Sequence, residues 1–248
     1  MHPYPGIDRR TSRRDASPEV PEKKLGLKHL RAAAIPLPPK KTISEHVATQ
    51  AVFLKNDLEP VLAEAKAGTR DVYFVDAAHF VRGAFLCCLW CVVRMFIRGA
   101  SGRQRYNVLG AWNAVTRGLI RISNTTRVSS DTMVELLVKI AAGAVRPITL
   151  VLDNARYQHC KKVKAEADRM GIQLLFLPSY SPNLNLIERL WKFIKAKALR
   201  GKHYNDFTLF QQAIDRCLDE TATTYADKMK SLMTLNFQTF DVTSFLAA

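Results

Sequence analysis

Acidic residues are scarce in this sequence relative to basic ones. Lys and Arg number 37 against 22 Asp and Glu, which gives a formal net charge of +15 at pH 7. An excess of this size points to a polyanionic partner. Nucleic acid is the leading candidate, and an anionic membrane surface is the alternative.

Long apolar runs are also lacking. The most apolar stretch, residues 85–97, contains Arg94 and is shorter than the roughly 20 residues that a helix needs to cross a bilayer. The first 24 residues are polar, basic and interrupted by proline, so no secretory signal is predicted. We therefore expect a cytoplasmic protein with no membrane partner.

Cysteine is scarce too. The five cysteines are odd in number and irregular in spacing, which in a cytoplasmic protein favours buried thiols over disulfides. Cys88 and Cys91 form a C-x-x-C pair, but no second pair accompanies it, so a zinc site is not expected.

Proline and basic residues are concentrated at the start of the chain. Residues 1–45 are predicted to form a basic, Pro-rich arm or linker, because this composition buries little apolar surface. Residues 46–222 are expected to form one catalytic domain, and residues 223–248 a C-terminal tail.

Hydrophobic periodicity predicts the elements of that domain. A helix is expected from Val47 to Ala67, kinked or divided at Pro60 and capped by Gly68. Three strand-like runs, expected to form an antiparallel meander, lie at 72–76, 85–97 and 105–112. Alternating elements follow: a helix at 131–142, a strand at 148–153, a helix at 156–170, a strand at 172–177, and helices at 186–199 and 206–220. This order is that of an α/β fold with a ribonuclease H-like mixed sheet flanked by helices.

Three acidic residues stand where such a fold places ligands. Asp76 and Asp153 each end an apolar strand, so both are expected at sheet ends, and Glu188 lies in the first turn of a helix. Carboxylates suit a pair of hard cations, which about 4 Å apart can activate a nucleophile and stabilise the leaving oxygen of a phosphodiester.

Each acid also has an ordinary structural interpretation. Either aspartate can simply end a strand or begin a turn. Glu188 can pair with Asn185 in a capping-box-like arrangement, or with Lys192 one helical turn later.

Three segments carry a family resemblance: FVDAAHF, VLDNARYQH and LPSYSPNLNLIERLWKFIK. They resemble the mariner superfamily of DDE transposases, and within it the bacterial insertion-sequence branch, over roughly residues 70–200. The resemblance implies that Asp76, Asp153 and Glu188 bind two catalytic ions, magnesium or manganese. The 34 residues between Asp153 and Glu188 match the spacing common in that superfamily.

The sequence departs from the family pattern at several positions. Ala77, Ser179, Asn183 and Leu186 stand where relatives often carry Glu, Pro, Asp and Pro, but none of these positions is a metal ligand. Relatives carry an N-terminal helix-turn-helix module, and we expect most of it to be missing from the 75 residues before Asp76. The chain is then a truncated copy, a deliberately shortened chain, or one frame of a frameshifted element.

Other residues near the acids have predicted supporting roles. Asn154 and His159 follow the second aspartate as in the family, where they could orient bound water or contact a phosphate, although Asn154 could equally cap the next helix. His79 is expected to be a surface or hydrogen-bonded histidine. Trp191 falls on the apolar face of its helix and is interpreted as core.

A basic run follows Glu188 in the sequence. It can hold DNA phosphates beside the metals or form a solvated helix face, and its residues are Lys192, Lys195, Lys197 and Arg200.

The expected function is that of a transposase catalytic domain, performing metal-dependent DNA cleavage and strand transfer of an insertion sequence. The resemblance implies DNA partners, both transposon ends and target DNA with TA sites, a homodimer on DNA, and a place at the bacterial nucleoid. Two alternatives remain: a ribonuclease H-like nuclease without strand transfer, and a catalytically silent DNA-binding remnant.

Overall fold

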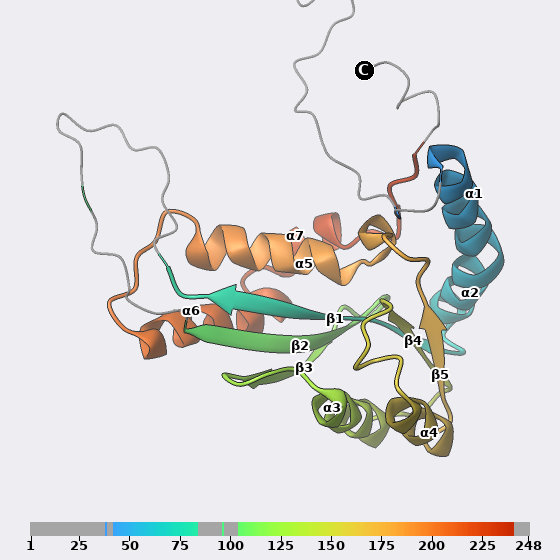
Figure 1. Ribbon diagram of the computed structural model, residues 1–248, viewed down its shortest axis with the longest axis horizontal. Coiled ribbons are helices and arrows are strands. Elements are labelled where there is room, and N and C mark those ends of the chain that lie inside the picture. Colours follow the sequence, from blue (N-terminus) through green and yellow to red (C-terminus); the bar gives the residue numbers. More distant parts are fainter. Residues whose placement is uncertain (1–37, 39–41, 84–95, 97–103, 241–248) are drawn as a thin grey trace, which may run out of the picture. The chain divides into compact units, whose positions relative to one another are not determined.

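A five-stranded mixed sheet organises the part of the chain that the computed structural model describes, residues 38, 42–83, 96 and 104–240 (Figure 1). Its strands are β1 (Asp71–Val81), β2 (Arg105–Asn113), β3 (Leu119–Asn124), β4 (Ile148–Leu152) and β5 (Ile172–Phe176). In space they follow the order β3-β2-β1-β4-β5; β1, β2 and β3 pair antiparallel, whereas β4 and β5 run parallel to β1. The predicted mixed sheet is confirmed.

The third antiparallel strand differs from the predicted one. The run at 85–97 lies outside the described residues except for Phe96, which is exposed and belongs to no element. The described meander is completed instead by β3, an edge strand in which only Ile122 is buried. Its apolar and polar residues alternate only over the four positions Ile120–Ser123, which is at the lower limit of the run that identifies a strand, and β3 was not predicted.

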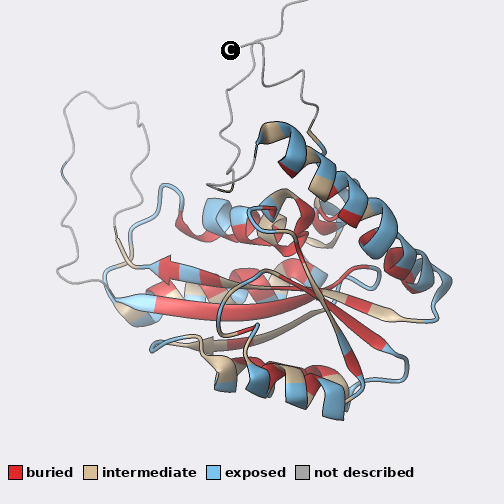
Figure 2. Cartoon of the chain, turned by 45° about the vertical axis from the view of Figure 1, so that its right-hand side comes forward, coloured by how far each residue is buried: buried red, intermediate tan, exposed pale blue. Residues whose placement is uncertain are grey.

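Helices cover both faces of the sheet (Figure 1). The helices are α1 (Ile43–Phe53), α2 (Glu59–Ala67), α3 (Ser130–Ala142), α4 (Lys161–Arg169), α5 (Ile187–Ile194), α6 (Phe207–Asp219) and α7 (Ala226–Leu232). Helices α3 and α4 share one apolar cluster with one face of the sheet, while the other five share a second cluster with the opposite face. In Figure 2 the inward sides of the helices are buried and the outward sides exposed.

Alternation along β1 assigns its side chains to these two clusters. Phe74, Ala78 and Phe80 belong to the cluster on the α5 side, whereas Val75 belongs to the cluster on the α3 side. Successive residues of a strand point to opposite faces. Asp76, two residues from Phe74 and from Ala78, therefore lies on the α5 side.

The first two helices are separated by a π-helical turn at Leu54–Leu58. Pro60 is the second residue of α2, which directly follows this π-helical turn. Gly68 follows α2 with a left-handed φ of 75° and closes the helix end. The predicted cap at Gly68 is confirmed, whereas the change of helix type lies at Leu54–Leu58, before Pro60, and the chain is helical through Pro60.

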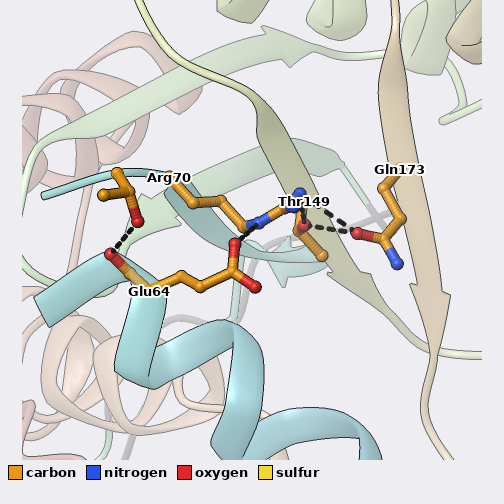
Figure 3. Close-up of polar contacts among 5 residues, drawn as sticks. Glu64, Arg70, Thr149 and Gln173 are labelled. Atoms are coloured by element: carbon orange, nitrogen blue, oxygen red, sulfur yellow. Dashed lines mark hydrogen bonds and ion pairs between the residues drawn. The ribbon is translucent and has the colours of Figure 1, made fainter. Parts of the chain in front are cut away.

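A polar cluster ties α2 to the N-terminal ends of β4 and β5 (Figure 3). The guanidinium of Arg70 donates to Glu64 Oε2 at 2.6 Å, to Thr149 Oγ1 at 3.0 Å and to Gln173 Oε1 at 3.2 Å. The Thr149 hydroxyl donates to the same Gln173 oxygen at 2.9 Å. Three elements are joined here by a cation that has an anionic partner.

The residues after 222, predicted to be a tail, include α7. Its Met229, and Met233 just beyond it, are buried in the cluster on the α5 side. Arg189 donates to the carbonyl oxygens of Leu232 at 3.2 Å and Thr234 at 2.7 Å, which fixes this segment beside α5. Among the helices of the described residues, none is both long and apolar enough to cross a membrane.

Candidate active site

Two aspartates meet where β4 leaves the sheet. The parallel pairing of β1 with β4 ends at Val75 opposite Leu152. Asp76 follows Val75, and Asp153 follows Leu152. The prediction that Asp76 ends its strand is wrong, because β1 continues to Val81, paired with β2. It is the end of β4 that exposes both positions at one edge.

Both aspartates lie on the face of the sheet that α5 covers. Asp153 is two residues from Val151, which belongs to the same apolar cluster as Phe74 and Ala78 on either side of Asp76. The period of two along each strand thus brings both carboxylates to one side. A helix end on that side can supply a third.

Helix α5 supplies Glu188 at its second residue. The chain reaches it through a 3₁₀ turn, Pro182–Leu184, and through the buried Asn185, whose Nδ2 donates to the carbonyl of Val75 at 3.3 Å. That bond holds the helix start against β1, one residue from Asp76. The start of α5 has no side-chain cap, so the capping-box interpretation of Glu188 is not supported.

The three acids line one cavity of about 410 Å³. Its other walls are Asn154, Ala155, Asn185 and the loop 177–182, which connects β5 to the turn before α5. The acids were predicted from the sequence, but the loop was not, because its place in the cavity wall depends on the path of the chain after β5.

Like charges and burial act together on the acids. Burial is the largest cause that raises the pKa of Asp76 to about 7, and the charges of Glu188 and then Asp153 raise it further, while N–H donors from Ala77 and Trp191 lower it. Burial also raises the pKa of Asp153, against the Ala155 N–H that donates to it at 3.1 Å. Perturbation of this kind is common at functional sites.

Two neighbours of Asp153 were not foreseen. The pKa of Tyr157 is raised, first by burial and then by the charges of Asp76 and Asp153. Gln158 is fully buried, and in one orientation of its amide Nε2 donates to the Asp153 carboxylate and, at 3.0 Å, to its carbonyl, while Oε1 accepts from the Tyr157 hydroxyl. No sequence motif indicated these contacts, because they depend on a turn that was predicted to be helical.

That turn begins the segment between Asp153 and α4. The prediction of a helix from Arg156 is wrong at its start, because α4 begins at Lys161 after a run of turns. Asn154 lines the cavity and donates from Nδ2 to the Leu177 carbonyl at 2.6 Å, and Cys160 holds the N-cap position that was considered for Asn154.

The two histidines near the aspartates lie outside the cavity lining. His159 is exposed, and its ring packs on Phe176 at a centroid distance of 4.4 Å. His79 bonds through Nδ1 to Asn107 Oδ1 at 2.7 Å, in keeping with the hydrogen-bonded histidine that was expected.

Trp191 combines a core position with a polar contact to the site. It is 2% exposed, as its place on the apolar face of α5 predicted, and its indole Nε1 donates to Asp76 Oδ2 at 2.9 Å. The spacing of apolar residues along α5 indicates which way the ring faces, but not that its N–H meets a carboxylate.

The basic run divides between two sides of its helix. Lys192, Lys195, Lys197 and Arg200 are all exposed. Lys192 and Lys195 follow Glu188 at helical spacings of four and seven residues, which keeps them on its side. Lys197 instead places its ammonium over the Tyr225 ring, 5.7 Å from the centroid.

The donor set fits a hard divalent cation. Magnesium and manganese prefer carboxylate oxygens, and three carboxylates line this cavity. The charges of Glu188 and Asp153 contribute to the raised pKa of Asp76, after burial. Among the described residues, no three His, Cys, Asp or Glu side chains stand close enough together to hold an ion as they are. Binding would therefore require the carboxylates to turn toward one another.

Comparisons with known proteins agree with this fold. A family model described as DDE superfamily endonuclease matches residues 95–211, which include Asp153 and Glu188 but not Asp76. A search of curated proteins found no match. The sheet order and its flanking helices define a ribonuclease H-like fold, shared with Mos1 transposase.

Three solved Mos1 structures illustrate that likeness. The Mos1 strand transfer complex matches with a TM-score of 0.56 at 12% identity, covering 80% of this chain and 59% of that one. The pre-cleavage Mos1 transpososome gives 0.54 at 11%, and the paired-end complex with left transposon end gives 0.53 at 10%, each covering 83% of this chain and 68% of the other. This chain thus spans about three fifths of the length of the first of these proteins.

Proposed function

We propose that this chain is the catalytic domain of a transposase of the bacterial insertion-sequence type, which cuts DNA at element ends and joins them to target DNA. One observation carries the proposal. Asp76, Asp153 and Glu188 come from β1, the end of β4 and α5, and they line a single cavity at the sheet edge, where burial and the charges of Glu188 and Asp153 raise the pKa of Asp76.

The reaction needs two exchanges at phosphorus. In the first, water adds to a phosphodiester at the element end and the 3′ oxygen leaves as a hydroxyl. In the second, that hydroxyl attacks a target phosphodiester, forming one P–O bond while another breaks. Two bound magnesium or manganese ions would activate the attacking oxygen and stabilise the leaving one.

The three acids of this chain would hold those ions, and two of them have a hydrogen-bond donor beside the cavity. Asp153 is anchored by the Ala155 N–H, and Asp76 by the Trp191 indole. Glu188 lies in the first turn of α5, and its side chain has no hydrogen bond to the other described residues. We assign it to assist proton transfer from the attacking oxygen. Solved Mos1 paired-end complexes include one with Mg and one with Mn, which supports divalent metal use here.

The DNA path runs, in this proposal, along the side of α5 that carries Glu188. Lys192 and Lys195 lie on that side and are exposed, so they can meet phosphates beyond the cavity. The Mos1 neighbours are described as paired-end and strand transfer complexes, which supports a DNA partner and a homodimer that pairs two ends.

Tyr180 is the residue we assign to the cleaved nucleotide. Its side chain lines the cavity, the residue is 49% exposed, and its φ of 61° is in the left-handed region. A bulky residue holds that backbone only where the surroundings or the function require it. An exposed aromatic ring at this rim offers a surface on which an unpaired base can stack.

Cleavage of supercoiled plasmid carrying element ends, with Mg²⁺ or Mn²⁺, tests the proposed function. Asp153→Asn should abolish nicking and joining, because it removes a ligand charge with little change of shape. Asp168→Asn, an exposed aspartate on α4, is the matched control and should act as wild type. Equal activity of Asp153→Asn and wild type would contradict the proposal.

The same assay separates the alternatives. Metal-dependent nicking that depends on Asp153 but never yields joined products would indicate a ribonuclease H-like nuclease. DNA binding without any cleavage would indicate a silent remnant of a transposase.

A further inference from the structure

The contact between Trp191 and Asp76 joins α5 to β1, and a residue of β2 lies beside it. The indole of Trp191 comes from α5, and the carboxylate it binds comes from β1. Directly across the ladder from Asp76, on β2, stands Gly110. Cross-strand partners share a face of the sheet, so Gly110 lies beneath the same helix.

Gly110 leaves the space that the indole fills. A Cβ at this position would lie 2.8 Å from Trp191 Cη2, which is closer than Cβ atoms approach other heavy atoms. It would also lie 3.1 Å from Trp191 Cζ2 and from Ile187 Cδ1, which are tight contacts. A larger residue at position 110 would therefore displace the indole ring whose N–H donates to Asp76.

The hydrogen bond fixes one oxygen of Asp76. Oδ2 accepts from the indole at 2.9 Å, which leaves Oδ1 as the carboxylate oxygen that does not face Trp191. The ring is held in turn by Phe80, in an edge contact with a centroid distance of 6.4 Å. A carboxylate whose neighbours repel it would otherwise rotate away from Glu188 and Asp153.

We propose that Trp191 is a positioning residue, which orients the Asp76 carboxylate for a divalent cation, and that Gly110 is the position that admits its indole. The inference rests on the proposed function for the identity of the cation. Partners that bind a metal-ligating side chain from behind commonly change metal affinity by about 10- to 100-fold when they are removed.

Trp112 provides a matched control for Trp191. It belongs to the same apolar cluster and is fully buried, but its Nε1 has no hydrogen-bond partner among the described residues. Trp→Phe at either position removes a similar volume from the same core. Only at 191 does it remove a donor to Asp76.

The test measures Mn²⁺ affinity by the electron paramagnetic resonance of the free ion. Trp191→Phe should weaken binding about tenfold, whereas Trp112→Phe should leave it unchanged even if both variants unfold at lower temperature. Gly110→Ala should weaken binding in the wild-type chain but add nothing to Trp191→Phe, because no indole N–H remains to be displaced.

A second readout needs no metal. In protein labelled with ¹⁵N at tryptophan, the indole resonance that disappears in Trp191→Phe should move in Asp76→Ala, while that of Trp112 should not. An unmoved resonance would overturn the proposal.

Failure of this inference and failure of the proposed function give different results. If wild type binds Mn²⁺, Asp153→Asn weakens binding, and Trp191→Phe binds as wild type does, only the positioning role falls. If wild type binds no Mn²⁺, the proposed function falls and this inference with it.

Discussion

Within the part of the chain that the structure describes, polar residues lie at both ends of the parallel strands β4 and β5, but their charges are paired at one end and unpaired at the other. At their N-terminal ends, Arg70 is bonded to Glu64, Thr149 and Gln173, so charge is balanced and donors have acceptors. Where β4 ends, Asp153 lies with Asp76 and Glu188 around a cavity, and the ion pairs found among the described residues include none of these three acids.

The cluster at Arg70 stabilises the fold, whereas the three acids are the site that we propose binds metal ions. Arg70 is partly buried and Glu64 is half exposed, but each side chain of this cluster has a partner, including the buried Thr149 hydroxyl. Three carboxylates together destabilise the protein by their own repulsion, and such an arrangement persists where function requires it. Changing each end in turn should therefore alter stability in opposite directions.

The largest expected effect is a stabilisation by Asp76→Asn. The folded-state pKa of Asp76 is about 7, above the ordinary 3.8, so the unfolded chain loses its proton first and the folded state loses stability as pH rises from about 4 to about 7. At pH 8 without metal, Asp76→Asn should raise the free energy of unfolding by about 2–4 kcal/mol, and below pH 4 by almost nothing. Denaturant unfolding at both pH values measures this.

The control for that result is the metal itself. Saturating Mn²⁺ should stabilise wild type but not Asp76→Asn, since the ion binds the ionised carboxylate. A difference in unfolding free energy that does not change with pH would show that the pKa of Asp76 is not raised in the folded protein.

At the opposite end, Arg70→Ala should destabilise the protein by about 1 kcal/mol, because the buried Thr149 hydroxyl loses a charged donor and the half-exposed Glu64 loses its ion pair. Mn²⁺ affinity should stay the same. Arg169→Ala, which removes an exposed i,i+3 ion pair on α4, is the matched control and should change stability by less than about 0.5 kcal/mol. Loss of Mn²⁺ binding in Arg70→Ala would break the contrast between the two ends.

The smallest expected effect concerns the basic run. Lys192→Ala and Lys195→Ala should each weaken DNA binding severalfold and lower the slope of log affinity against log salt by about 1, because each removes one phosphate contact. Lys197→Ala should leave both unchanged, since its ammonium lies over Tyr225. Equal effects of all three, measured by fluorescence anisotropy across salt concentrations, would refute a path along one side of α5.

Sequence alone located the three acids but not what surrounds them. Asp76 and Asp153 were placed by apolar strands, and Glu188 by the start of a helix and a family resemblance. Gly110 could not be recognised, because its role depends on the register that sets it opposite Asp76. The contacts of Gln158 could not be predicted, because Gln158 lies in a turn that was expected to be helical. The strand β3 was missed because it is short and lies at the edge of the sheet.

One departure from the pattern that the sequence resembles has a structural explanation. Asn183, where that pattern often has Asp, donates from Nδ2 to Gln50 Oε1 at 3.0 Å and to the Gln238 carbonyl at 2.8 Å. An aspartate there has no proton to offer either oxygen. The loop before Glu188 is thus tied to α1 on one side and to the C-terminal segment on the other.

The most direct measurement of the central claim is an anomalous difference map from crystals grown with Mn²⁺. The account predicts peaks within coordination distance of Asp76, Asp153 and Glu188, with their carboxylates turned toward the ion. A well-ordered structure with no manganese at this edge, or with manganese held only elsewhere, would contradict it.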